Sequence, residues 1–468
     1  MATTNLNLFS WNDVDLLPEL QRLSLVLDYL PDEAIVQALE EKRRGGRNDY
    51  PVAAMWRAVV AGIVFQHESM ASLIRELSRN PRLLSVCGFD PLPRRQGPLI
   101  PSHHNFSRFL LNLIELEEKR GLVSGMIPAL REQLMEALPD FGVHLGYDGK
   151  AIQSHSTGNK NRTTGNTSDP DADWGKHETG GVDSRTGKPW KKVKSWFGYT
   201  LHLIADTHYE IPVAFEMTKA SKGESPQLRT MTQQLLHEEN PALGERCWDF
   251  SADRGLDCKE TKRLLWDEYS IRPLIDTREL WREEKQAPDY DPAKPITRPL
   301  YPERVDTIVH TEKGAVHCFC PDSGEMRDMA FQGFEADRNT LKYRCPAAAY
   351  GLECSGKTAC HRMGGVQPGQ YGRSVRIPLN RDRRTFTPIP HGSPSWKKGY
   401  NRRSALERIN NRVDHGYGFE KHFVRGLKKM KARMGLALAV MMAMALGHVR
   451  AGREEQMRSL IQPIPIAA

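Results

Sequence analysis

The spacing of apolar residues changes at Pro139, and this change constrains the fold more than any other feature. Before it, residues 52–65 and 69–79 show helical spacing, and a further helix is predicted from the leucines at 110–116 toward Leu138. After it come short segments of the kind that form strands, at 143–148, 199–205, 211–217, 247–253 and 271–276, with helices predicted at 224–238 and 259–266. Strands interspersed with helices predict a mixed α/β layer, preceded by an all-helical N-terminal domain over residues 1–140.

Local signals complete this outline. Residues 150–154 are expected to form a strand that pairs back on the first strand. Asp257 is expected to cap the helix predicted at 259–266, and the polar stretch 155–195 is expected to form a long loop. Residues 280–395 are rich in Pro and Cys with little helical periodicity, which predicts an inserted subdomain of strands and loops. Helical spacing returns from Tyr400, with a break near 416–418. The α/β core is therefore expected to comprise 141–279 and 396–450, followed by a tail at 451–468.

The longest apolar run, residues 434–449, is shorter than the roughly 20 residues that a membrane span needs. We expect a buried core helix there and no membrane partner. The first residues show no basic region followed by an apolar one, so no signal peptide is expected. Eight cysteines in 468 residues do not predict a disulfide scaffold, and the expected location is the cytoplasm.

Positive charge is concentrated in one part of the chain. Residues 373–433 hold 17 Lys and Arg against 4 Asp and Glu, a net charge of +13, whereas the whole chain carries +8. Such a segment is typical of a nucleic-acid-binding surface. The alternative is a solvated helical face, which needs no nucleic acid.

Three acids are placed as a phosphodiester-cleaving site requires. Asp148 and Asp253 each end a predicted strand, and Glu407 lies on one helical face with Tyr400 and Arg403. Carboxylates are the ligands that hard divalent cations prefer, and two such ions can activate a nucleophile and stabilise the leaving oxygen. The alternatives are ordinary: an Asp at a strand end often forms a turn, and Arg403 with Glu407 could be a surface ion pair.

Other acids compete for this role less well. Asp169, Asp171 and Asp173 cluster in a predicted loop, where solvation is the simpler explanation. Asp206 also follows a strand, but it lacks the Asp-x-x-Gly context of Asp253.

The segments around the three acids resemble the bacterial insertion-sequence transposases of the DDE type. The matching segments are Gly-Tyr-Asp-Gly-Lys-Ala (146–151), Ala-Asp-Arg-Gly (252–255) and the Tyr-x-x-Arg-x-x-x-Glu signature at 400–408. Residues 196–202 are similar to a core strand of the family, and residues 79–88 and 101–110 to its helical N-terminal domain. One position departs from the extended signature, since Asp414 stands where a Lys often follows the Glu by seven residues.

This resemblance implies an RNase H-like core that cleaves transposon ends and joins them to target DNA. It implies Asp148, Asp253 and Glu407 as ligands of two Mg²⁺ or Mn²⁺ ions. The implied partners are double-stranded DNA, as terminal inverted repeats and target, and a second subunit in a homodimer on DNA. The N-terminal domain would bind DNA ends or the second subunit, and the protein would be associated with the bacterial nucleoid. The residues expected to bind DNA or support the site are Tyr400, Arg402, Arg403, Arg408, Lys428, Lys429 and Lys431.

Two other functions remain open from sequence. One is a non-transposing RNase H-like endonuclease, and the other is a catalytically silent DNA-binding protein derived from a transposase. The signature helix and the N-terminal domain favour a transposase over the first, and the intact acid triad argues against the second.

Five cysteines form a cluster within the predicted insertion. They are Cys318, Cys320, Cys345, Cys354 and Cys360, with His361 adjacent to the last. Four thiolates, or three with a His, would suit a structural zinc site. The spacings are not of the paired C-x₂-C type, so a set of buried free thiols is the equal alternative.

Overall fold

The computed structural model describes residues 18–43, 50–90, 98–158, 167–182, 189–278, 281–285, 287, 290–291, 295–365 and 372–459. The chain divides into two compact units. Unit 1 comprises Met1–Gly142, Asp148–Gln227 and Ala405–Ala468, and unit 2 comprises Val143–Tyr147 and Leu228–Ser404. Each unit is described separately below.

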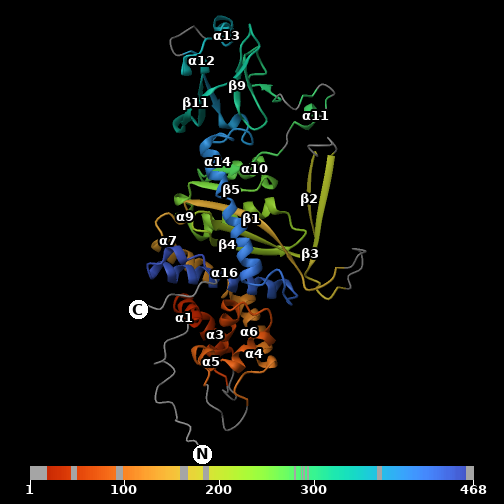
Figure 1. Cartoon of the computed structure of the whole chain (residues 1–468), viewed down its shortest axis with the longest axis vertical. Helices are drawn as coiled ribbons and strands as arrows, with labels where there is room; N and C mark the ends of the chain where they lie inside the picture. Colours follow the sequence, from red (N-terminus) through yellow and green to blue (C-terminus); the bar gives the residue numbers. More distant parts are fainter. Residues whose placement is uncertain are drawn as a thin grey trace, which may run out of the picture. The chain divides into compact units, whose positions relative to one another are not determined.

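The N-terminal part of unit 1 is helical, as predicted (Figure 1). Its helices are α1 (Pro18–Tyr29), α2 (Glu33–Lys42), α3 (Val52–Val64), α4 (Met70–Arg79), α5 (Pro81–Cys87), α6 (His103–Arg120) and α7 (Met126–Ala137). The continuous helix predicted across 110–138 is wrong, because α6 ends at Gly121, whose φ of 60° favours glycine. Residues 91–97, which precede α6, lie outside the described residues.

The apolar run at 434–449 lies within α16 (Leu427–Arg450). This helix contacts α1, α3, α6 and α7 on one side and strand β4 (Ile211–Lys219) on another. By length and composition α16 could cross a membrane, but 94% of its most apolar window is buried within the protein. The prediction of a buried core helix is therefore confirmed.

The central sheet has six strands, in the order β2-β3-β1-β5-β6, with β4 paired to β3. β3 (Pro189–Asp206) runs antiparallel to both β2 (Asp173–Val182) and β4. β1 (His144–Gln153) runs parallel to β5 (Asp249–Ala252), which is parallel to β6 (Arg272–Ile275). The predicted return strand at 150–154 is wrong, because β1 continues without a turn through Gln153.

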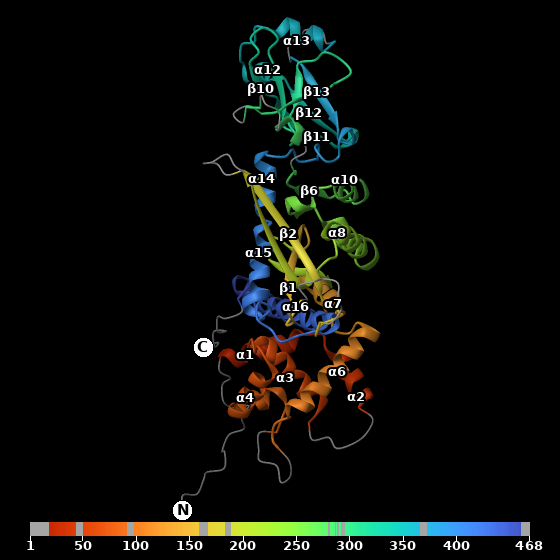
Figure 2. The same cartoon turned by 90° about the vertical axis from the view of Figure 1, so that its right-hand side faces the viewer.

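The stretch 155–195 is also not the continuous loop that its polarity predicts. Residues 173–182 form β2, and β3 begins at Pro189 rather than near Tyr199. Figure 2 shows β2 and the first half of β3 as a two-stranded ribbon. Residues 159–166 and 183–188 of this stretch lie outside the described residues.

Helices α8 (Glu224–Gln233), α9 (Pro241–Arg246) and α10 (Lys259–Arg263) accompany the parallel strands, and both α8 and α10 continue as π-helical turns. Asp257 does not cap α10. The cap is Cys258, whose sulfur accepts a hydrogen bond from the Thr261 amide. Asp257 is instead buried and paired with Lys262 at 2.8 Å.

Within the predicted insertion, two small antiparallel sheets form. One comprises β7 (Arg298–Pro299), β8 (Ile308–His310), β9 (Val316–Phe319) and β10 (Met326–Asp328), and the other β11 (Ala330–Glu335), β12 (Thr340–Arg344) and β13 (Ser374–Pro378). Both sheets contribute to one apolar core, which includes Ile308, Val316, Leu341 and Ile377. Three short helices accompany them, α11 (Arg282–Lys285), α12 (Pro346–Tyr350) and α13 (Lys357–Met363).

The segment after the insertion is helical, as predicted, but interrupted. α14 (Pro394–Asn401) ends unit 2, and α15 (Ser404–Asn411) continues as a π-helical turn to Gly416 in unit 1. Gly418 and Gly426 have φ of 68° and 93°, so the chain departs from helix before α16 begins.

Candidate active site

Asp148 is held by a residue of α15. It is half-buried on β1, and the Asn410 side-chain amide donates a hydrogen bond of 2.7 Å to its Oδ2. The other amide atom, Asn410 Oδ1, is buried and has no hydrogen-bond partner among the described residues. An unpaired buried oxygen beside a carboxylate costs free energy unless a donor or a cation binds it.

Glu407 lies on α15 three residues before Asn410, and its side chain is exposed. Residues three apart lie on the same helical face, so Glu407 shares a face with the residue that bonds to Asp148. Asn410 was not predicted as a site residue from the sequence, although its spacing of three from Glu407 is visible there. Asn411, four residues after Glu407, is exposed.

Asp414 occupies the position at which the family often has a Lys. In this chain Lys150, two residues after Asp148, donates to Asp414 Oδ2 at 2.6 Å. A cation is therefore present beside this turn of helix, but it comes from β1.

A fourth acid, Glu224, lies against the chain next to Asp148. A methyl group added at Gly149 would stand only 2.6 Å from the Glu224 carboxyl carbon. Gly149 is therefore required by the close approach of this carboxylate. No motif marked Glu224 in the sequence, because only the fold brings α8 to β1.

Asp253 follows β5 in unit 2 and caps a short 3₁₀ turn, accepting from the Gly255 amide at 3.3 Å. The register pairs Tyr147 of β1 with Ala252 of β5. Asp148 therefore directly follows Tyr147, and Asp253 directly follows Ala252, and these two preceding residues are partners in the parallel pairing of β1 and β5.

Tyr400 belongs to an aromatic stack. Its ring lies parallel to that of Trp396 with centroids 4.6 Å apart, and the Arg403 guanidinium is 5.7 Å from the Tyr400 centroid. Burial raises the Tyr400 pKa, the Arg403 charge opposes this shift, and the charge of Asp253 adds to it. Tyr400 therefore lies in the electrostatic surroundings of Asp253.

Most of the basic residues proposed to bind DNA form ion pairs. Arg402 donates to Asp249 at 2.6 Å and Arg408 to Glu210 at 2.8 Å. Lys428 pairs with Glu118, and Lys431 with Glu216 at 2.9 Å. Lys429 differs, because the described residues give it no ion pair.

The competing aspartates have structural roles. Asp169 is fully buried and accepts hydrogen bonds from Ser154 and Tyr199, so its expected solvation is wrong. Asp171 and Asp173 accept from the amides of Leu427 and Ser221. Asp206, also fully buried, accepts from three backbone amides, and burial raises its pKa.

None of the eight cysteines, all of which are described, forms a disulfide bond. Burial raises the pKa of Cys318 to about 12, and the nearby Cys345, Cys360 and Cys354 add to this shift. The Cys320 pKa is lowered to about 6 by hydrogen bonds from Ser323 and Ser355. Across the described residues, no group of three or more His, Cys, Asp or Glu is arranged to hold a metal ion.

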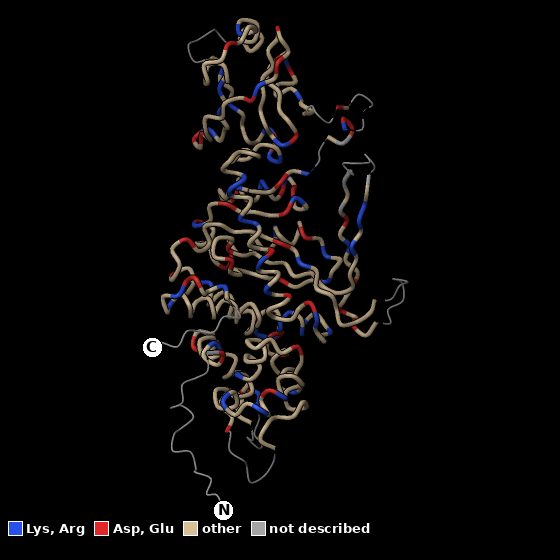
Figure 3. The backbone as a smooth tube through the Cα atoms, viewed as in Figure 1, with Lys and Arg blue, Asp and Glu red and all other residues tan. Residues whose placement is uncertain are grey.

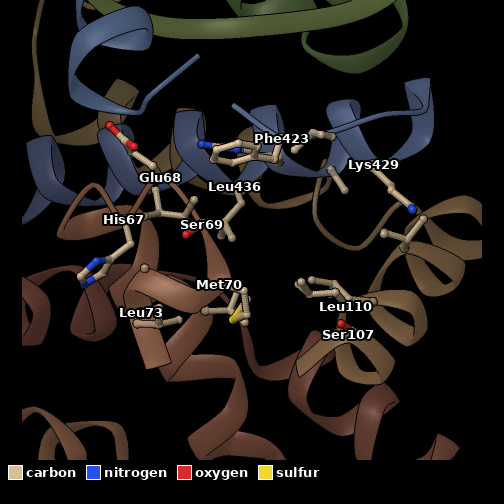
Figure 4. Close-up of a pocket in the computed structure, with 18 of the residues that line it drawn as sticks. His67, Glu68, Ser69, Met70, Leu73, Ser107, Leu110, Phe423, Lys429 and Leu436 are labelled. Atoms are coloured by element: carbon tan, nitrogen blue, oxygen red, sulfur yellow. The ribbon is translucent and has the colours of Figure 1, made fainter. Parts of the chain in front are cut away.

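A cavity of about 890 Å³ lies elsewhere in unit 1, between α4, α6, α16 and the residues before α16 (Figure 4). Figure 4 shows Phe423 and Leu436 facing Met70 and Leu110 across it. None of the three candidate acids lines this cavity.

Two family models match the chain. Residues 13–111 match a transposase domain (DUF772), and residues 143–443 match the transposase DDE domain. Because the second match covers more than half of the chain, the protein belongs to the DDE transposase family. It is a DNA transposase whose core is the RNase H-like mixed α/β layer that the resemblance implied.

One solved structure is similar, described as the cryo-EM structure of piggyBac transposase synaptic complex with hairpin DNA. It shares 12% identity over 95% of this chain and 80% of that chain, with a TM-score of 0.38, too distant to carry an argument. No curated protein matches the chain.

Proposed function

We propose that Asp148, Asp253 and Glu407 together hold two Mg²⁺ or Mn²⁺ ions and that this site both cleaves transposon ends and joins them to target DNA. The observation that supports it best is the hydrogen bond from Asn410 to Asp148, because it links the strand of the first acid to the helix of the third. Asp253 follows the strand that is paired with the strand of Asp148.

The donor set fits a hard divalent cation. The candidate ligands are carboxylate oxygens, and the unpaired Asn410 Oδ1 adds a neutral oxygen beside them. When bound, such ions would activate the attacking oxygen and stabilise the charge on the leaving one. Glu224, against Gly149, is a further acid that could complete the set.

The chain's own residues position these ligands. Asn410 fixes the orientation of Asp148, and the Lys150–Asp414 pair joins β1 to the helical segment of Glu407. In the proposed reaction water attacks the phosphorus at the transposon end and displaces the 3′ oxygen of the transposon strand, which leaves as a 3′-hydroxyl. That hydroxyl then attacks a target phosphorus and displaces the 3′ oxygen of the target strand. Both displacements place the same demands on the three carboxylates, so one site can serve both.

The wider assembly is part of the same proposal. The N-terminal helices would bind DNA ends or a second subunit of a homodimer, and the transposase would act in the cytoplasm on bacterial nucleoid DNA. The insertion would be a separate subdomain with bounds near 280 and 395. Its cysteines would either hold one structural zinc ion or remain buried free thiols, the two alternatives that the sequence leaves open.

The test is a pair of assays on Asp148→Asn and Glu407→Gln, with end binding measured without metal and nicking measured with Mg²⁺. Each change removes a ligand charge at constant shape, so nicking should fall on the order of 10³-fold or more, because each 1.36 kcal/mol is tenfold in rate. End binding should survive, since phosphate contacts come from Lys and Arg.

Glu420→Gln is the matched control, because Glu420 is exposed in the same segment and forms an ion pair with His415. It should nick at the wild-type rate. If Glu407→Gln nicks normally, Glu407 is not a ligand, and Glu224 and Asp414 become the candidates. Adding target plasmid separates the rivals, since an endonuclease would nick without joining and a silent DNA-binding protein would do neither.

A further inference from the structure

The segment that leads from the π-helical turn after α15 to the start of α16 alternates in exposure. Lys421, Phe423 and Arg425 are exposed, Phe423 by 61%, whereas His422 is buried and Val424 is half-buried between them. A period of two is that of an extended chain, whose successive side chains point to opposite sides. An aromatic ring therefore lies between two cations on one exposed side of the segment.

This segment is anchored to the residues just beyond β1, the strand that carries Asp148. The His155 amide donates to the Val424 carbonyl at 3.4 Å, and Arg425 Nε donates to the His155 carbonyl at 2.9 Å. The ring of His155 contacts that of Phe423 in a T-shaped arrangement, with centroids 5.1 Å apart. β1 ends five residues after Asp148, a rise of roughly 17 Å. The exposed side of the segment is therefore held close to the end of the strand of the first candidate acid.

The cations around Phe423 are not neutralised by the acids of unit 1 that the structure describes. The nearest acid in sequence, Glu420, pairs with His415. Within the described ranges, no ion pair includes Lys421, Arg425 or Lys429, all of which are exposed. These three residues are among the positions coloured blue in Figure 3. This surface therefore carries a net positive charge.

The cavity of about 890 Å³ in unit 1 lies beside the same residues. Phe423, Arg425 and Lys429 line it, together with apolar side chains of α4, α6 and α16. Figure 4 shows Phe423 facing Met70 and Leu110 across it. Since Phe423 lines the cavity and is also largely exposed, the cavity reaches the surface at this residue. A cavity of this size holds a molecule as large as a nucleotide, and it does not hold a duplex.

We propose that Lys421, Phe423 and Arg425 bind single-stranded DNA, with bases stacked on Phe423 beside the cavity and phosphates at the two cations. Proteins bind single strands through a basic surface that carries aromatic side chains, because every base has a face that can stack. A duplex would satisfy the cations but not the ring, since its bases already stack on one another. The inference rests on the proposed function, because a strand cut at a transposon end can unpair from its complement.

The experiment measures binding without metal to a labelled dT oligonucleotide of about 16 nucleotides and to a blunt duplex of the same length, with the full-length transposase. Phe423→Leu keeps the apolar bulk but removes the stacking face. It should weaken single-strand binding about ten-fold or more and change duplex binding by less than about two-fold. Phe423→Trp keeps an aromatic face and should bind the single strand as wild type does. Phe331→Leu is the matched control, because Phe331 is 41% exposed on β11 of the insertion, and it should change neither affinity.

The cations are tested by the salt dependence of single-strand binding. Each phosphate contact contributes about 0.7 to the log–log salt slope on a single strand, so Lys421→Gln with Arg425→Gln should flatten the slope by about 1.4. Lys176→Gln with Lys191→Gln also removes two charges, but both lysines pair with Glu178. This control should flatten the slope by less than half as much.

Wild-type single-strand affinity in Phe423→Leu would overturn the proposal, and so would an equal loss of single-strand and duplex binding. A change of oligomeric state in Phe423→Leu with single-strand binding intact would also overturn it, because the surface would then be a subunit contact. Nicking of end DNA by the wild-type protein with Mg²⁺ is measured in parallel. Its absence would count against the proposed function and not against this surface, because the binding assays contain no metal.

Discussion

The basic segment 373–433 and the β2–β3 ribbon carry their positive charge in different surroundings. Ten of the 17 Lys and Arg in the segment form ion pairs with acids outside it, including Arg373, Arg384, Arg402 and Arg412. The ribbon instead pairs Lys176 and Lys191 with an acid of its own, Glu178. Charge density along a sequence is therefore a poor guide to charge density at a surface.

The ion pairs of the basic segment 373–433 have a structural role. Its ion pairs connect α14, α15 and β13 to strands and loops of their own units, and Glu407 lies among them on α15. We infer that much of this charge stabilises the elements that carry the signature residues. Four predictions test this contrast, beginning with the largest expected effect.

The largest effect on the free energy of unfolding is expected from the cysteines of the insertion. If they hold zinc, purified protein should contain about one zinc ion per chain that survives removal of Mg²⁺, because thiolates suit zinc and carboxylates suit magnesium. Cys345→Ser should then lose the zinc and several kcal/mol of stability. Cys87→Ser, at a buried helical cysteine outside the insertion, is the control for a lost thiol. Reduced protein without zinc would favour the free-thiol alternative.

Next in size is the buried pair of Arg373 and Asp306. Their side chains are 3% and 0% exposed, and Arg373 Nη2 donates to Asp306 Oδ2 at 2.5 Å. Arg373→Gln leaves a buried carboxylate with less compensation and should cost about 3 kcal/mol of unfolding free energy in urea. Arg376→Gln breaks a half-exposed pair with Glu335 and should cost less than 1 kcal/mol. Equal costs would contradict the structural role of Arg373.

A smaller, pH-dependent effect is expected at Asp276. Burial raises its pKa, but the hydrogen bond from His391 and the charge of Lys313 outweigh burial and lower it to about 2. A carboxyl with a depressed pKa stabilises the fold above its unfolded pKa of about 3.9, and this contribution is lost as pH falls toward 2. Asp276→Asn should therefore be less stable than wild type by about 1 kcal/mol at pH 6, after allowance for solvent screening.

The difference in the free energy of unfolding between wild type and Asp276→Asn should shrink as the pH falls from 4 to about 2. Denaturant titration at each pH measures it. A difference that stays constant over this range would mean that the Asp276 charge does not stabilise the fold.

The smallest effect is expected on the salt dependence of DNA binding, when Lys428, Lys429 and Lys431 are compared with one another. We predicted from sequence that all three contact phosphates. Lys428 and Lys431 pair with Glu118 and Glu216, whereas Lys429 is exposed beside the cavity of Figure 4. Lys429→Gln should flatten the salt slope by about 0.9 and weaken binding a few-fold, and Lys428→Gln should change the slope less. Identical slopes in both variants would remove the distinction between paired and unpaired lysines.

Local chemistry in the sequence was enough to predict much of this transposase. Helical spacing located α3, α4 and the buried α16, and apolar segments located β1, β4, β5 and β6 within a few residues. The acids at strand ends and the signature helix gave the family, which the DDE domain match confirms. Such features depend on neighbours within one turn or one strand, so they are visible along the chain.

Contacts between distant residues were decided only by the tertiary structure. Asn410 meets Asp148, Lys150 meets Asp414 and Glu224 lies against Gly149, although no local pattern links the members of each pair. The ribbon at 173–198 was missed because its polar, Gly-containing strands are stabilised by each other and not by an apolar face. The neutralisation of the basic segment was missed for a related reason. Its acids come from other parts of the sequence, and only folding brings opposite charges within a few ångströms, where their attraction is strong.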